Sequence, residues 1–96
     1  MNTPEEAQKM AIRIIRSQVP DPAYKVFLFG SRATGKAHER SDIDLGIEGP
    51  APLPYEILSN ILEDIEETPT LYSIDVVDFA RVPEKFKQVA RERVYT

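Results

Sequence analysis

The sequence predicts an α/β (α+β) fold: a small mixed or antiparallel sheet of three or more strands with helices packed on it. Apolar stripes with helical spacing alternate with short β-branched and aromatic runs, in the order α-β-β-α-β-α. Residues 41–48 alternate strictly between apolar and polar side chains, as a strand with one buried face does. Because 96 residues suit one compact domain, we expect 1–96 to form a single domain.

The first helix is expected to begin after Thr3. Thr3 can accept a hydrogen bond from the backbone of the first turn, Pro4 suits the first helical position, and Glu6 completes a capping box. Pro20 ends the pattern. The residues predicted to face the core are Ala7, Met10, Ala11, Ile14 and Ile15.

Two strands are expected next, over 24–29 and 41–48. In the second, Ile43, Leu45 and Ile47 share one face, while the other face carries Asp42, Asp44, Gly46 and Glu48. The loop over 30–41 joins the two strands, so we expect them to be adjacent and antiparallel.

The second half of the chain predicts a helix, a strand and a last helix. Residues 57–65 form a second amphipathic stripe (Ile57, Leu58, Ile61, Leu62 and Ile65), which closes at Thr68-Pro69. Residues 71–79 predict a third strand. Pro83 is expected to open a last helix, with Phe86, Val89, Ala90 and Val94 facing inward.

Composition excludes several classes of protein. A net charge of −4 disfavours strong non-specific binding to nucleic acid. No apolar run approaches the length of a membrane span, and the first residues do not resemble a secretory signal, so a cytoplasmic protein without membrane contact is expected. With no cysteine, disulfides and thiolate metal sites are excluded. An acidic cluster over 63–67 is either a solvated helix end or a docking patch for a basic partner.

Asp42 and Asp44 point the same way from the second strand, with their α-carbons roughly 6.5–7 Å apart. Carboxylates this close repel each other unless a cation lies between them. Hard oxygen ligands on a stiff backbone suit Mg²⁺, and a metal pair can act on both oxygens of a phosphoryl displacement. Of the two aspartates in 71–79, only one can face this site. Asp75, flanked by apolar residues, is the predicted ligand, and Asp78 is interpreted as an edge or capping residue.

The turn before the second strand indicates a phosphate site. Gly30 allows close approach of the backbone to a ligand, and Ser31 supplies a hydroxyl and an amide. If 31–35 begins a short helix, its unpaired N–H groups favour an anion. A triphosphate could rest there, and Arg32, Lys36 and Arg40 could balance its charge.

These residues resemble the nucleotidyltransferase superfamily of DNA polymerase β. The motif of that superfamily is a Gly-Ser turn, about ten residues and Asp-x-Asp, and here it reads Gly30-Ser31 and Asp42-Ile43-Asp44. Ser41 matches the serine before the first aspartate, and Asp75 matches the third carboxylate. Within the superfamily, the chain resembles the minimal nucleotidyltransferases (MNT) that are paired with HEPN-domain toxins.

The resemblance implies transfer of AMP from ATP to a hydroxyl group, with two Mg²⁺ ions held by Asp42, Asp44 and Asp75. It implies nucleotide binding by Gly30, Ser31, Arg32 and Ser41. The implied partner is a HEPN toxin whose tyrosine is AMPylated, which would make the chain an antitoxin. Alternatives are transfer to a small molecule or an RNA end, or a non-catalytic module that binds the toxin.

Overall fold

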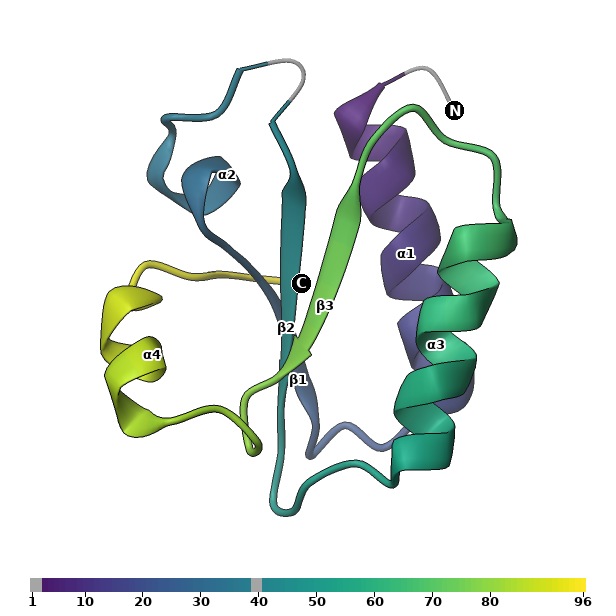
Figure 1. The fold of residues 1–96 in the computed structure, drawn as a ribbon, viewed down its shortest axis with the longest axis vertical. Helices are drawn as coiled ribbons and strands as arrows, with labels where there is room; N and C mark the ends of the chain where they lie inside the picture. Colours follow the sequence, from purple (N-terminus) through teal and green to yellow (C-terminus); the bar gives the residue numbers. More distant parts are fainter. Residues whose placement is uncertain (1–2, 39–40) are drawn as a thin grey trace.

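One mixed sheet organises the part of the chain that the structure, a computed structural model, describes: residues 3–38 and 41–96. Its strand order is β3-β2-β1-β4 (Figure 1). The strands are β1 (Lys25–Phe29), β2 (Ile43–Glu48), β3 (Ile74–Asp78) and β4 (Val94–Tyr95). Strand β1 is antiparallel to β2 and β4, whereas β2 and β3 are parallel. The predicted fold class and the antiparallel pairing through the 30–41 loop are confirmed.

Helices cover the two faces of the sheet unequally. The long helices α1 (Pro4–Gln18) and α3 (Tyr55–Glu67) lie together on one face, and the short helices α2 (Ser31–Thr34) and α4 (Glu84–Val89) lie on the other (Figure 1). The predicted cap of α1 is present, since the Thr3 hydroxyl accepts a hydrogen bond from the Glu6 N–H at 3.1 Å. Among the described residues, no helix has the length and apolar character that crossing a bilayer requires.

The face under α1 and α3 is an aliphatic core. The alternation in β2 is confirmed, because Ile43, Leu45 and Ile47 are all fully buried there. Ile15 of α1 and Ile61 of α3 are fully buried and belong to the same core cluster. Burying each such side chain stabilises the fold by about 1.5–3 kcal/mol. In the apolar stripe predicted for α3, Leu62 differs from the prediction because it is 42% exposed.

The opposite face of the sheet is aromatic. The rings of Phe27 and Phe79 meet edge to face with centroids 4.8 Å apart, and Phe29 meets Phe79 at 5.2 Å. Gly46 of β2 lies under Phe27 and Phe79, and a Cβ there would overlap both rings. Glycine is therefore required at this strand position, because the rings occupy the space of a side chain.

The C-terminal segment departs from the prediction. Helix α4 ends at Val89 with Ala90 as its C-cap, so Val94 is not part of a helix. Instead, Val94 pairs with Leu28 as part of the edge strand β4 and is 47% exposed. The expectation that Val94 faces inward from the last helix was wrong, since the chain leaves the helix and returns to the sheet edge. Ala90 is buried as predicted, and the Val89 side chain lies outside the described part of the structure.

Candidate active site

Three carboxylates gather where β2 and β3 begin. The two strands are parallel, and their register places Asp44 directly beside Asp75. In-register residues of adjacent strands project from the same face, about 4.8 Å apart. Asp42 precedes β2 and projects to that same side, two residues before Asp44. The structure therefore places the predicted aspartates Asp44 and Asp75 side by side, and Asp42 lies near enough for its charge to act on Asp44.

The charges of this group act on one another. Burial raises the pKa of the Asp44 carboxyl, and the neighbouring charges of Asp75 and then Asp42 raise it further. Asp44 is half-buried, whereas Asp42 and Asp75 are exposed. Within residues 3–38 and 41–96, no lysine or arginine forms an ion pair with these three carboxylates, so a divalent cation would relieve their repulsion.

The chemistry of the group fits Mg²⁺, which prefers oxygen ligands and usually takes only one or two carboxylates from the protein. Among the residues that the structure describes, no three acidic, histidine or cysteine side chains are grouped so as to hold one metal ion. The donor set and its repulsion fit a cation, and the assignment of metal ligands stays a prediction.

The turn after β1 is pressed against Asp44. Phe29, the last residue of β1, pairs with Asp44, and Gly30 follows with φ 72° and ψ −154°. This backbone conformation is essentially restricted to glycine. A Cβ at Gly30 would overlap Asp44 Oδ2. Gly30 therefore brings the turn and the carboxylate group together, as the prediction of close backbone approach requires.

The predicted short helix after the turn is present as α2. It begins at Ser31, and the Gly30 carbonyl accepts the N–H groups of Ala33 and Thr34. Gly35 ends it in the left-handed region with φ 76°. Ser31 therefore lies directly beside Gly30, at the start of the helix.

Arg32 and Ser41 hold the loop that leads to Asp42. Arg32 Nη2 donates to the Ser41 carbonyl at 2.7 Å, and Ser41 Oγ accepts the His38 N–H at 3.0 Å. The carbonyl that Arg32 binds immediately precedes Asp42, so these contacts position the carboxylate. Their predicted contact with a nucleotide stays a prediction. Arg40 lies outside the described residues.

Asp78 has the structural role that its interpretation as a capping residue implied. It is only 4% exposed and accepts the N–H of Leu53 at 2.8 Å and of Ala80 at 3.0 Å. Arg81 Nε lies 3.5 Å from its carboxylate. The reasoning that selected Asp75 was wrong, because Asp75 is exposed and Asp78 is the aspartate in an apolar setting.

Two cavities flank the carboxylate group. The larger, of about 460 Å³, borders Asp75 and is lined also by residues of α3 and the loop after it. A smaller one, of about 230 Å³, borders Gly30 and is lined also by Gln88, Ala90, Arg91 and Glu92. The sequence analysis treated 88–92 as part of a helix and missed this neighbour. One signal could have found it: 41–80 contains no lysine, arginine or histidine, so cations for a nucleotide must come from elsewhere.

A family model and a curated relative both match most of this chain. The family model "Polymerase beta, Nucleotidyltransferase" matches residues 11–94. A relative from Haemophilus influenzae, "Probable protein adenylyltransferase MntA", is 34% identical over 89 residues, which cover 91% of this chain and 76% of the relative.

Solved structures share the fold. A crystal structure of a toxin–antitoxin with AMP-PNP superimposes with a TM-score of 0.61 at 22% identity, over 93% of this chain and 70% of the other. A tri-AMPylated Shewanella oneidensis HEPN toxin in complex with an MNT antitoxin gives a TM-score of 0.57 at 18% identity, over 95% and 69%.

Proposed function

The chain belongs to the polymerase β nucleotidyltransferase family, and on that premise we propose that it transfers AMP from ATP to a tyrosine of a HEPN-domain toxin. It would thereby act as the antitoxin of the pair. The observation that carries the proposal is the side-by-side placement of Asp44 and Asp75, with the Gly30 turn against Asp44. The adenylyltransferase name of the H. influenzae relative and the AMPylated toxin of the structural neighbour support the choice of AMP and partner.

The roles of the residues follow from their positions. Gly30 and Ser31 would bind the phosphates of ATP, and Asp42, Asp44 and Asp75 would hold two Mg²⁺ ions. When bound, the metal ions would neutralise charge on the phosphates and favour the ionised form of the acceptor hydroxyl. The acceptor oxygen forms a bond to the α-phosphorus while the bond to pyrophosphate breaks. Asp75, which borders the larger cavity, would accept the proton of the acceptor hydroxyl.

The acceptor side of the site is acidic. The strands and helix from 41 to 80 contain most of the acidic residues of the chain and no basic ones. An RNA end would bring further phosphates to this side and be repelled, since like charges this close are unfavourable. The side chain of a tyrosine is neutral near pH 7, so it is not repelled in this way. The charge distribution therefore favours a protein acceptor over the RNA alternative.

The test is transfer to the cognate toxin, followed by mass spectrometry. With ATP and Mg²⁺, the toxin should gain mass in units of AMP. Asp44→Asn should reduce the rate at least about a hundredfold, because the metal-dependent charge stabilisation is worth several kcal/mol. Glu5→Gln, which removes an exposed carboxylate of α1 that lines neither cavity, is the matched control and should leave the rate unchanged.

Two results would contradict the proposal. A toxin that never gains mass, although it binds the chain, would favour neutralisation by occlusion. Equal transfer rates for Asp44→Asn and Glu5→Gln would show that the carboxylate group takes no part in the chemistry.

A further inference from the structure

The cavity beside Gly30 has one wall made by the C-terminal segment. The turn contributes Gly30 and Thr34, and the segment after α4 faces them across about 230 Å³. Of the residues that line this cavity, Arg91 carries a positive charge and Glu92 a negative charge. The complete lining is Gly30, Thr34, Gln88, Ala90, Arg91 and Glu92.

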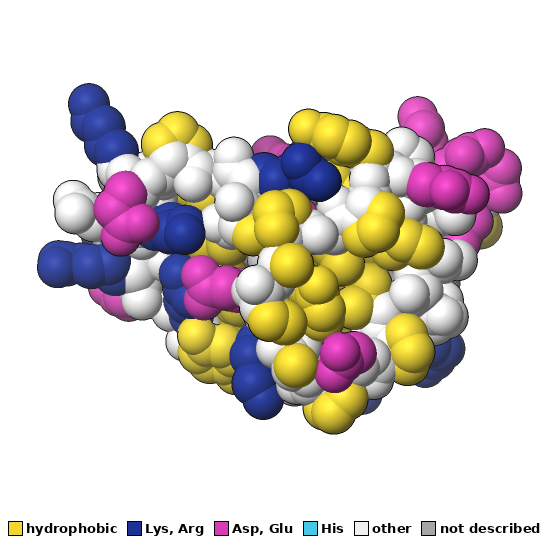
Figure 2. Space-filling model, turned by 90° about the horizontal axis from the view of Figure 1, so that it is seen from below, with side chains coloured by type: hydrophobic (Ala, Val, Ile, Leu, Met, Phe, Trp, Pro, Cys, Tyr) yellow, Lys and Arg dark blue, Asp and Glu magenta, His cyan; other side chains and the backbone are white. Residues whose placement is uncertain are grey.

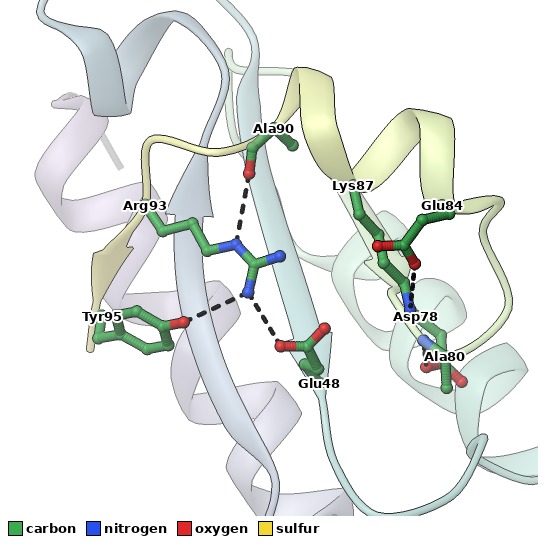
Figure 3. A network of polar contacts seen from close by, with 8 residues as sticks. All are labelled: Glu48, Asp78, Ala80, Glu84, Lys87, Ala90, Arg93 and Tyr95. Carbon is green, nitrogen blue, oxygen red and sulfur yellow. Dashed lines mark hydrogen bonds and ion pairs between the residues drawn. The ribbon is translucent and has the colours of Figure 1, made fainter.

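The contacts of Arg93 hold the segment after α4, which includes Arg91, against the sheet. The Arg93 guanidinium lies 4.4 Å from the ring centroid of Phe27 and 4.9 Å from that of Phe79. It also donates to the Ala90 carbonyl at 3.3 Å and to Glu48 Oε1 at 2.9 Å (Figure 3). These contacts hold the backbone on both sides of Arg91 against the sheet, so Arg91 is presented to the cavity from an ordered segment.

The basic residues of the chain are unevenly distributed along the sequence. Because 41–80 contains no basic residue, the cations of the chain come from its two flanking parts. Figure 2 shows this division: acidic side chains gather at the end of the molecule that holds α3, and several Lys and Arg side chains lie at the opposite end, which holds α4. The Gly30 cavity lies toward the basic part, because residues 88–92 form one of its walls.

We propose that Arg91 binds the β- and γ-phosphates of the nucleoside triphosphate across the cavity from Gly30. This inference rests on the proposed function, because it places the triphosphate at the Gly30 turn. A guanidinium can donate two parallel hydrogen bonds to phosphate oxygens. The α-phosphate lies nearer the carboxylates in this arrangement, so Arg91 contributes to binding of ATP and not of AMP.

Arg91 has a competing structural role that the test must separate. It also borders a cavity of about 410 Å³ on its other side, together with Glu48 and Glu84. A purely structural arginine would pair with those acids. Its removal would then lower the melting temperature without changing which nucleotide binds.

The experiment is isothermal titration calorimetry of the full chain with ATP and with AMP, in Mg²⁺. Arg91→Ala should weaken ATP binding about tenfold to a hundredfold, the loss expected for a hydrogen-bonded charge pair, and leave AMP binding unchanged. Arg91→Lys should recover part of the affinity. Lys85→Ala is the matched control, because Lys85 is an exposed cation of α4 that lines neither cavity.

The outcomes are distinguishable. If the wild-type chain does not bind ATP, the proposed function fails and this inference fails with it. If the wild type binds ATP and Arg91→Ala binds it equally well, only the role of Arg91 is overturned. A lowered melting temperature with an unchanged ratio of ATP to AMP affinity would also overturn it, in favour of the structural role.

Discussion

Asp44 and Asp78 lie on neighbouring strands of one sheet. Of the two, only Asp78 has its charge paired with a cation within the described part of the chain. Asp78 is buried, accepts two backbone N–H groups and lies 3.5 Å from Arg81 Nε. Arg81 in turn donates to the Leu53 carbonyl and stacks on the ring of Tyr55. The pKa of Asp44 is instead raised by burial and by two neighbouring carboxylates.

This difference distinguishes the carboxylate of Asp78, which stabilises the fold, from that of Asp44, which is available for chemistry. The contacts of Asp78 fasten the loop before α3 to the end of β3, which stabilises the fold. The repulsion around Asp44 destabilises the free protein, and such unfavourable charge is typical of functional sites. Each prediction below changes one side of this comparison.

Of the effects predicted in the paragraphs below, the largest is expected from Gly30→Ala. The new Cβ would overlap Asp44 Oδ2, and the alanine would have to adopt the backbone angle φ 72°. We expect at least a tenfold loss of AMP transfer and a loss of about 1–3 kcal/mol in the free energy of unfolding. Transfer is measured by mass spectrometry and stability by urea denaturation.

Gly35→Ala is the matched control. Gly35 also has a positive φ, of 76°, but open space surrounds the position of its Cβ. It should lose roughly 1–2 kcal/mol of stability through backbone strain and keep its transfer rate. Equal transfer rates in the two variants would show that contact with Asp44 is not what Gly30 provides.

The helices and strands could be predicted from the sequence where the pattern of apolar residues extends over many positions. The stripe in 4–18 and the alternation in 41–48 predicted a helix and a strand with the correct buried faces. The two-residue strand Val94–Tyr95 was missed because it is too short to show a period. Its position depends on Arg93 folding back onto Phe27, a contact between distant parts of the chain.

The carboxylate group could be predicted because a strand fixes the side to which Asp42 and Asp44 point. The surroundings of Asp75 could not be predicted in this way. The apolar neighbours Ile74 and Val76 project to the opposite face of β3, so they describe that face and not the one that Asp75 occupies. Arg91 was missed for a related reason, because its proximity to Gly30 depends on how the C-terminal segment packs.

Asp78→Asn should have the second-largest effect, and on stability alone. The amide can accept only through one oxygen, so the N–H of either Leu53 or Ala80 loses its partner. We expect a loss of about 1–3 kcal/mol in the free energy of unfolding, measured by urea denaturation. Transfer per folded molecule should be unchanged. Unaltered stability would mean that these hydrogen bonds do not hold the loop.

The smallest effect is a gain of stability in Asp44→Asn without metal, and it should depend on pH. The folded-state pKa of Asp44 is raised above 3.8, so the unfolded chain loses this proton more readily than the folded one. Ionisation therefore lowers wild-type stability as the pH rises from 3.8 to the folded pKa, and the penalty then stays constant. Asparagine removes the penalty. Urea denaturation in EDTA should show Asp44→Asn more stable than wild type at pH 7, and the gap should narrow as the pH falls toward 3.8. A gap that is constant with pH would mean that the gain does not come from the charge of Asp44.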